Sequence, residues 1–168
     1  MEKTEFVNTV MPFKDKLYRI AKRILISEDE AEDAVQEVYV RLWNSRENLK
    51  TYRSPEAFAV TITKNYCLDR LKSKQAGNLK IVHSNYEAKE SIERNIEARE
   101  GVSLVLKIME SLPTQQRIVL QLRDIEQYEF SEIAEMLESN ETAIRVALSR
   151  ARKAVRDEMI KNYNYGVS

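Results

Sequence analysis

The side chains best suited to chemistry lie near the end of the chain, where basic residues recur at helical spacing. Between Thr142 and Arg156 the sequence contains no Asp or Glu. The polar side chains of this stretch share one face of a predicted helix: Arg145, Ser149, Arg150, Arg152, Lys153 and Arg156. An unopposed basic face can neutralise phosphates, although many helices carry such a face with no ligand but water. We interpret this stretch as a candidate nucleic-acid interface.

Two predicted helices position this basic face. Ser131 is expected to cap the first, and a polar break at residues 138–140 separates it from the second. Apolar residues spaced by three and four along the second helix, Ile144 and Leu148 among them, form its buried side. Such a pair is typical of a helix-turn-helix, whose second helix can lie in the major groove. Glu138 stands where these turns favour glycine, because the backbone there often needs a positive φ.

Catalytic chemistry has no comparable signal. The chain has one cysteine, Cys67, so it cannot form an internal disulfide. With one histidine, His83, beside this cysteine in the composition, the sequence offers no credible metal cluster. Paired carboxylates, a Ser/His/Asp set and a phosphate-cradling glycine loop are also missing from the sequence. We therefore expect no catalytic residue, no metal site and no cofactor, and we interpret the chain as a binding protein rather than an enzyme.

Composition indicates an all-helical, cytoplasmic protein. Its 168 residues include only three Gly and three Pro, and no apolar run approaches the roughly 20 residues that span a bilayer. The first ten residues do not resemble a signal peptide. Twenty-seven basic residues balance 27 acidic ones, but acidic side chains gather at residues 28–37 and basic ones at residues 64–80 and 142–156. This segregation favours contacts with nucleic acid and with a basic protein surface, although acidic residues also suit a helix N-terminus.

Hydrophobic periodicity predicts helices over residues 5–26, divided or delayed at Pro12, and over a second stretch begun by a Ser27–Glu30 capping box. Residues 44–52 are expected to form a polar connector. Ser54 and Pro55 then start a helix that runs to about residue 74.

After residue 74 the periodicity fades, so residues 75–90 are expected to be a linker, and it resumes near residue 91. A break follows at residues 112–113, and Thr114 is expected to cap the next helix. The predicted fold is all-α, with two small helical domains: residues 1–74 form a three- or four-helix bundle and residues 91–168 form a helix-turn-helix domain.

In this order and spacing, the motifs resemble the sigma-70 family of transcription initiation factors, specifically the extracytoplasmic-function (ECF) type. The segment SEDEAEDAVQEVYVRLW resembles family regions 2.1–2.2, which bind the clamp helices of the RNA polymerase β′ subunit. The resemblance implies a polymerase-binding role for five residues: Asp33, Gln36, Glu37, Leu42 and Trp43.

The segment PEAFAVTITKNYCLDRLK resembles family regions 2.3–2.4, which recognise and melt the minus-ten promoter element. The resemblance implies that an unstacked base is captured in a pocket whose loop would be residues 47–53, and that melting is offset by contacts to the single strand. It assigns minus-ten contacts to Lys64, Asn65, Asp69, Arg70 and Lys72. Asn65 could pair with a base edge, and the basic side chains could hold phosphates.

The segment from residue 110 to residue 156, which contains LPTQQR and RVALSRARK, resembles family region 4, the reader of the minus-thirty-five element. The resemblance implies DNA contacts by Arg145, Val146, Ser149, Arg150, Arg152 and Lys153. Arg145 is the best candidate for a bidentate contact to guanine. Arg152 and Lys153 could instead meet phosphates or flank a contact with the polymerase β flap.

The family likeness thus predicts a promoter-specificity subunit. Its expected partners are RNA polymerase core (β′ clamp helices and β flap), promoter DNA and an anti-sigma factor, without membrane insertion. A stand-alone helix-turn-helix regulator with an N-terminal interaction domain is the alternative, and a purely structural helical adaptor is a third possibility. The regulator should bind duplex DNA tightly by itself, whereas a chain of zero net charge has little non-specific affinity without polymerase.

Overall fold

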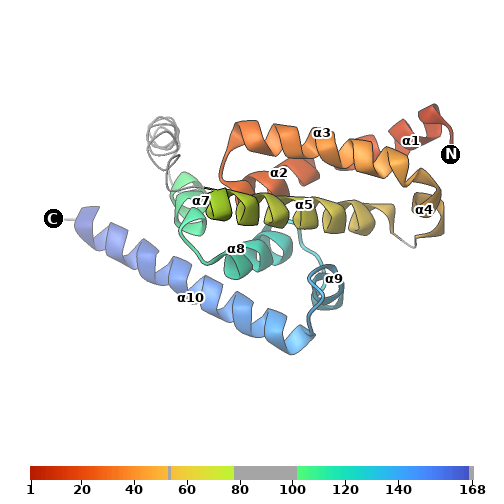
Figure 1. The fold of residues 1–168 in the computed structure, drawn as a ribbon. Coiled ribbons are helices and arrows are strands. Elements are labelled where there is room, and N and C mark those ends of the chain that lie inside the picture. Colours follow the sequence, from red (N-terminus) through yellow and green to blue (C-terminus); the bar gives the residue numbers. More distant parts are fainter. Residues whose placement is uncertain (53, 78–101, 167–168) are drawn as a thin grey trace.

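The computed structural model describes residues 1–52, 54–77 and 102–166, and all regular elements within these ranges are helices (Figure 1). This confirms the predicted all-α class. Of the predicted linker at residues 75–90, residues 78–90, with His83, lie outside the described residues, as do residues 91–101, where the next helix was expected to begin.

The first domain contains five α-helices around a common core. In chain order they are α1 (Lys3–Val10), α2 (Lys14–Leu25), α3 (Glu28–Asn44), α4 (Arg46–Thr51) and α5 (Pro55–Gly77). A short 3₁₀ turn, η1 (Met11–Phe13), separates α1 from α2 at Pro12, because proline lacks the amide hydrogen that would continue α1. The predicted division of the first helix at this residue is therefore confirmed.

Serine caps fix where α3 and α5 begin. Ser27 Oγ accepts a hydrogen bond from the Glu30 amide at 3.2 Å, and Ser54 Oγ accepts one from the Ala57 amide at 3.1 Å. Both starts match the predictions. The end of α2 has a feature without a clear sequence signal: its C-cap, Ile26, has a φ of 57°, which is rare for a β-branched residue.

The predicted polar connector at residues 44–52 is wrong, because most of it forms the helix α4. Leu49 of α4 is 1% exposed and anchors the helix to the core. One apolar side chain carries too little periodicity to distinguish a short helix from a loop in sequence. Helix α5 also differs from the prediction at its C-terminal end: it runs to Gly77, three residues past the predicted end of the first domain.

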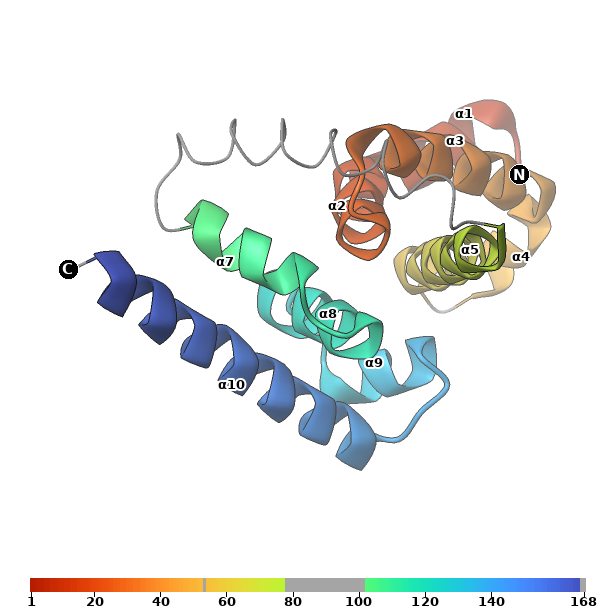
Figure 2. The same ribbon diagram turned by 60° about the vertical axis from the view of Figure 1, so that its left-hand side comes forward.

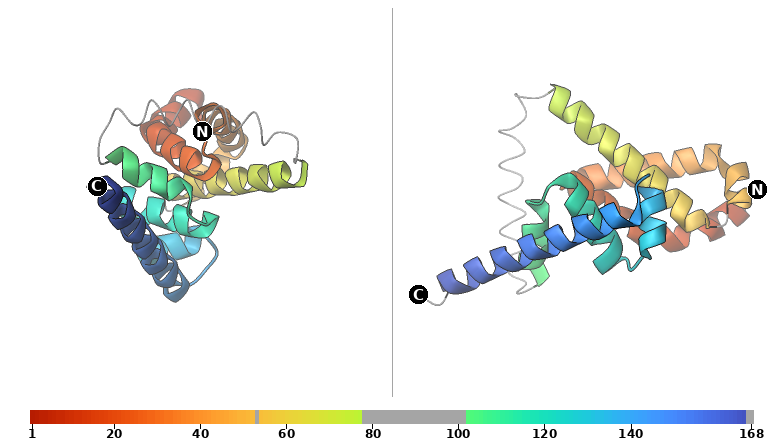
Figure 3. Two further views of the ribbon diagram at one scale, coloured as in Figure 1. Left: turned by 90° about the vertical axis from the view of Figure 1, so that its left-hand side faces the viewer. Right: turned by 90° about the horizontal axis from the view of Figure 1, so that it is seen from below.

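The second domain consists of α7 (Val102–Glu110), α8 (Thr114–Leu120), a π-helical turn η2 (Gln121–Ile125), α9 (Phe130–Met136) and α10 (Glu141–Gly166). Helix α10 packs along α7, α8 and α9, and its C-terminal end projects from the molecule (Figure 3). The helix-turn-helix formed by α9 and α10 confirms the predicted arrangement. Glu138 in its turn has a φ of 51°, as the expected glycine preference implied, and Gln127 has a φ of 64°.

Two predicted caps in this domain are wrong. Thr114 is the first residue of α8 rather than its cap, and Ser131 lies inside α9, which begins one residue earlier at Phe130. Neither helix has a side-chain cap. The cap that sequence reasoning missed is Asn140, whose Oδ1 accepts a hydrogen bond from the Ala143 amide at 2.8 Å at the start of α10.

The two domains pack against each other. Helix α2 lies against α8 and η2, and α5 lies against α9 (Figures 1 and 2). Buried apolar side chains form one continuous cluster, from Leu17 and Ile20 in the first domain to Ile118 and Leu122 in the second. The described parts of the molecule therefore form a closed arrangement.

Candidate nucleic-acid interface

Helix α10 presents its basic face to solvent. Ile144, Leu148 and Ala151 are buried against the domain core, which turns the opposite side of the helix outward. All six residues predicted to meet duplex DNA are exposed: Arg145, Val146, Ser149, Arg150, Arg152 and Lys153. The structure thus brings these six side chains together on one accessible surface.

Two arginines of this face are held by neighbours. The Arg145 guanidinium lies 4.1 Å from the ring centre of Phe130 and 4.0 Å from the Glu141 carboxylate, yet its side chain remains 60% exposed. Arg152 donates to both carboxylate oxygens of Asp124, with an Nε–Oδ2 distance of 2.9 Å, and this bonding raises the pKa of Arg152. The Arg145 guanidinium makes only a distant ion pair with Glu141 and stays largely exposed, whereas the charge of Arg152 is offset by direct hydrogen bonds to Asp124.

The candidate minus-ten residues on α5 divide into exposed and buried groups. Asn65, Asp69 and Lys72 are exposed, and Arg70 is half exposed with Glu30 at 3.8 Å. Lys64 is only 6% exposed, and burial lowers the pKa of its ammonium group despite the opposing influence of Glu138 and Asp69. Lys64 is therefore covered in this arrangement, and its contact with a phosphate stays a prediction.

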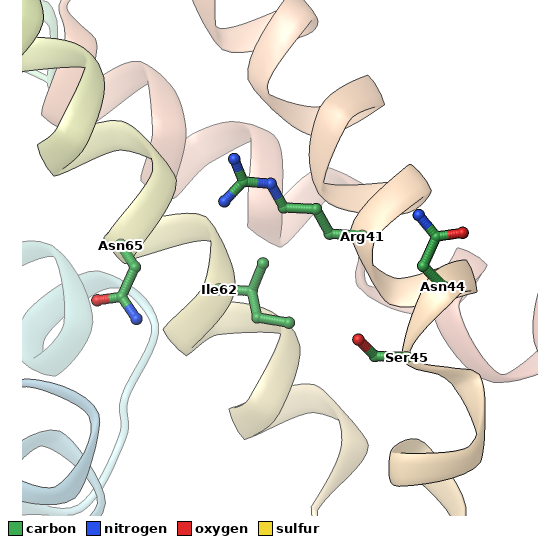
Figure 4. Close-up of a pocket in the computed structure, with 5 residues that line it drawn as sticks. All are labelled: Arg41, Asn44, Ser45, Ile62 and Asn65. Atoms are coloured by element: carbon green, nitrogen blue, oxygen red, sulfur yellow. The ribbon is translucent and has the colours of Figure 1, made fainter.

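A pocket of about 320 Å³ opens between the C-terminal end of α3 and the middle of α5 (Figure 4). Figure 4 shows its lining residues: Arg41, Asn44, Ser45, Ile62 and Asn65. Amide, guanidinium and hydroxyl groups can together donate to and accept from the polar edge of a small planar ring, and Ile62 supplies an apolar surface. Of these residues, sequence reasoning named only Asn65.

The pocket residues contributed by α3 carry a sequence signal that was overlooked. Asn44 and Ser45 are short polar side chains at the C-terminal end of a helix, where the chain changes direction.

The Arg41 guanidinium lies 5.0 Å from the ring centre of Tyr66, which holds it toward α5. Tyr52, in the predicted pocket loop, is half exposed and stacks on Phe58 with the ring centres 4.2 Å apart.

The acidic face of α3 remains open. Asp33 and Gln36 are exposed, and Glu37 is half-buried. Trp43 is also half-buried, with its ring 5.1 Å from that of Phe6 and the Arg46 guanidinium 4.2 Å above it. Leu42 is fully buried and packs in the core beneath this face, so any part it has in polymerase binding stays a prediction.

A groove of about 520 Å³ runs beside this acidic face, between η1, α2 and α3. Its lining mixes apolar and acidic side chains: Met11, Lys14, Asp15, Tyr18, Glu32, Val35, Gln36 and Tyr39. The Tyr39 hydroxyl is buried and has no hydrogen-bond partner among the described residues, and burial raises the pKa of Tyr39 to about 12. A partner that brings an acceptor to this hydroxyl would satisfy it.

Among the described helices, none is long and apolar enough to cross a membrane. The same residues contain no group of three or more His, Cys, Asp or Glu side chains placed to hold a metal ion. The one cysteine, Cys67, is buried, and burial raises the pKa of its thiol to about 12.

Two family profiles match the chain in the order of its two domains. The profile for sigma-70 region 2 matches residues 9–77, and that for sigma-70 region 4 matches residues 103–155. The first match ends where α5 ends, and the second contains the helix-turn-helix.

Curated relatives are ECF sigma factors. The chain is 29% identical over 165 residues to the ECF RNA polymerase sigma factor SigJ of Mycobacterium tuberculosis, covering 92% of this chain and 50% of SigJ. It is 28% identical over 153 residues to SigE of Mycolicibacterium smegmatis, covering 88% of this chain and 59% of SigE. It therefore spans about half the length of these two relatives. For SigW of Bacillus subtilis the identity is 24%, and the match covers 92% of this chain and 88% of SigW.

Two solved structures share the fold over nearly the whole chain. CnrH in complex with the cytosolic domain of CnrY has a TM-score of 0.71 at 21% identity, covering 95% of this chain and 90% of that one. The sigma factor RpoE in complex with the anti-sigma factor NepR, from Bartonella quintana, has a TM-score of 0.66 at 16% identity, covering 91% and 95%. With both regional profiles matched and ECF sigma factors as its relatives, the chain belongs to the sigma-70 family and is of the ECF type.

Proposed function

We propose that the chain is a promoter-specificity subunit that binds RNA polymerase core and directs it to promoters. The observation that carries the proposal is the exposed basic face of α10 in a helix-turn-helix, within a run from Thr142 to Arg156 that contains no Asp or Glu. The domain that precedes it adds an acidic helix face and a polar pocket, which supply surfaces for a protein and for an unstacked base. In this role the chain has no catalytic chemistry of its own and acts in the cytoplasm with the polymerase.

We assign recognition of the minus-thirty-five element to α10. A helix lying in the major groove contacts base edges with its N-terminal residues, and Arg145 is the fifth residue of α10. Its exposed guanidinium could bind one guanine through two hydrogen bonds, which is worth about 1–3 kcal/mol of discrimination. Arg150 and Lys153 are better suited to phosphates, together with Arg152 once it leaves Asp124.

We assign the minus-ten element to the pocket that contains Asn65. Extruding a base costs a few kcal/mol, so the pocket must return that free energy through hydrogen bonds and stacking. The Asn44 and Asn65 amides could read a base edge, and the exposed Tyr52 ring offers a stacking surface worth about 1–3 kcal/mol. Lys72 and Arg70 lie on the same helix and could hold the flanking phosphates.

We assign polymerase binding to the acidic face of α3, with the neighbouring groove. Asp33 and Glu37 could pair with a basic helical surface such as the β′ clamp helices, and Gln36 belongs both to this face and to the groove. Charge complementarity of this kind increases the association rate and the specificity more than the affinity itself.

We also propose that an anti-sigma factor holds the chain inactive. The support is a likeness of fold: RpoE and CnrH, which share this fold, were solved in complex with NepR and the cytosolic domain of CnrY. A contact between the second domain, near Arg152 and Lys153, and the polymerase β flap is likewise proposed from the family resemblance.

Reversing the charge of the α3 face tests polymerase binding. The double variant Asp33→Arg/Glu37→Arg should lose association with purified core, measured by co-elution in size-exclusion chromatography, and should lose run-off transcription from a genomic promoter library. The variant Glu2→Arg/Glu5→Arg makes the same charge change at the N-terminal end of α1, away from α3, and should retain both. Unchanged co-elution of the α3 variant would remove the assigned surface, and failure of the wild-type chain to support promoter-dependent transcription would refute the proposed function.

A further inference from the structure

One aromatic ring of the second domain contacts two arginines. Phe130 is the first residue of α9, and its half-buried ring packs against the hydrophobic core. The guanidinium carbon of Arg145 lies 4.1 Å from the centre of this ring, and that of Arg123 lies 4.4 Å from it. Both distances are within the roughly 6 Å over which the face of a ring attracts a cation. We call these three residues the arginine stack.

Arg123 is held at the ring by the backbone. Its Nη1 donates a hydrogen bond to the Tyr128 carbonyl at 2.8 Å, and the Glu129 carboxylate lies 3.9 Å away. Tyr128 is buried, so this bond fixes Arg123 to the segment that leads into α9. The stack therefore contains one fixed cation, one ring packed against the core, and one cation, Arg145, whose side chain is 60% exposed.

The contact between Phe130 and Arg145 crosses the turn of the helix-turn-helix. Phe130 belongs to α9 and Arg145 to α10, and α9 packs against α10 near the start of α10 (Figure 1). Glu138, with its φ of 51°, lies in the turn between the two helices. The position of the Arg145 side chain therefore depends on α9 as well as on α10.

A guanidinium that lies over a ring can still bind a base. Its N–H donors lie in its own plane and point away from its edge, so stacking occupies the face and leaves the donors available. A bidentate contact to guanine requires these donors to align with O6 and N7 of the base. Arginine has many rotamers, and a side chain already held over Phe130 loses fewer of them on binding. The fixed charge of Arg123 also disfavours Arg145 rotamers that approach it.

We propose that Phe130 is a positioning residue for base recognition: its ring, with Arg123 fixed over it, holds the Arg145 guanidinium in the orientation that contacts guanine. The inference rests on the proposed function, in which Arg145 contacts a base of the upstream element. Phe130 itself does not touch DNA and acts through Arg145.

A purely structural role for Phe130 has a different consequence. Loss of packing at the start of α9 would weaken binding to every DNA sequence alike, because the whole helix-turn-helix would be affected. Loss of positioning lowers the preference for one base at one position and leaves the phosphate contacts unchanged. Phe130→Leu separates the two roles, since leucine keeps an apolar side chain but has no ring face for a cation.

Run-off transcription by the chain with core measures this preference, on templates that carry each of the four base pairs at the upstream position where Arg145→Ala loses discrimination. Phe130→Leu should lower the preference there by about two- to fivefold, the factor for one cation–π contact at an exposed site. Phe130→Tyr keeps the ring and should retain the preference. In the Arg145→Ala background, Phe130→Leu should change it no further. Phe13→Leu, the same substitution at a half-buried position of the first domain, is the control.

The restraint on Arg145 is measured separately in the free chain by NMR. The Arg145 Nε–Hε signal is assigned by its loss in Arg145→Lys. Its heteronuclear NOE should be higher in wild type than in Phe130→Leu, because the ring limits the fast motion of the side chain.

Each outcome bears on one claim. Full preference in Phe130→Leu, an equal loss in Phe13→Leu, or a further loss in the Arg145→Ala background would overturn the positioning role. An Arg145 side chain that is equally mobile in wild type and Phe130→Leu would overturn it as well, whatever the transcription result. If Arg145 is restrained by the ring but the wild-type chain directs no promoter-dependent transcription, the proposed function is refuted together with the base contact, while the stack itself stands.

Discussion

At the scale of single residues, Arg145 is the side chain best prepared to read a base. The contacts of its guanidinium with Phe130 and Glu141 restrict the side chain, so Arg145 loses less rotamer entropy on binding than a fully mobile arginine would. Its neighbour Arg152 is committed to Asp124 and must exchange that partner before it meets a phosphate. We therefore expect Arg145 to contact a base and Arg152 to contact a phosphate, although both lie on the same face of α10.

Replacing Arg145 with alanine should relax preference at one upstream base pair. We expect a loss of about 1–3 kcal/mol of discrimination there, because one bidentate contact is removed. Run-off transcription from templates varied at each upstream position measures the effect, with core affinity as the internal control. If core affinity fell as much as transcription, α10 would not have the assigned role.

At the scale of helices, α4 shows what sequence patterns miss. A short helix held by one buried leucine has no period to detect, and its polar residues are those of an ordinary loop. The long helices α3 and α10 were predictable, because apolar residues recur at helical spacing over several turns of each. The Ser27 cap also marks the start of α3, and the run without acidic residues marks the basic face of α10. The helix-turn-helix and its positive φ at Glu138 followed from the same local patterns.

The buried anchor of α4 gives a stability test. Leu49→Ala should lower the free energy of unfolding in urea by about 2–5 kcal/mol, as expected for a leucine removed from a packed core. Asn48→Ala, at the exposed neighbouring position, should change it by less than about 0.5 kcal/mol. Equal effects of the two substitutions would mean that α4 is not anchored by Leu49.

The π-helical turn η2 links the domain interface to DNA recognition. Gln121 of η2 and Glu126, the residue that follows η2, bond to α2 across the interface, while Asp124 of η2 bonds to Arg152 of α10. π-Helical turns are rare and occur often at functional sites. No single-residue motif in the sequence indicated this turn, because it results from where the two domains meet.

At the scale of the whole molecule, sequence predicted two helical domains but not their contact. The residues that join them, such as Arg23 and Gln121, are 98 positions apart and look like ordinary surface side chains. The same limit applies to the candidate sites: exposure of the α10 face was predictable from its period, whereas burial of Lys64 depends on the neighbouring domain.

The Glu56 contact predicts a pH dependence of stability. Burial alone would raise the pKa of Glu56, but hydrogen bonds from Lys16 and Tyr128 outweigh it and the net pKa is lowered from 4.5. The ionised carboxylate therefore stabilises the folded chain above pH 4.5, and this contribution is lost as the pH falls through the lowered value.

Urea unfolding of wild type and Glu56→Gln between pH 7 and pH 3 measures this contribution. The wild type should be the more stable of the two at pH 7, and the difference should shrink below about pH 4.5. A difference that stays constant over this range would show that the charge of Glu56 does not stabilise the fold.

We expect the chain to recognise promoters as part of the polymerase, and an electrophoretic mobility shift with and without core can measure this. A promoter fragment selected by run-off transcription should shift with the chain and core together and not with the chain alone. The zero net charge predicts weak binding by the free chain. Tight, sequence-specific binding by the free chain would contradict the account and favour a stand-alone regulator.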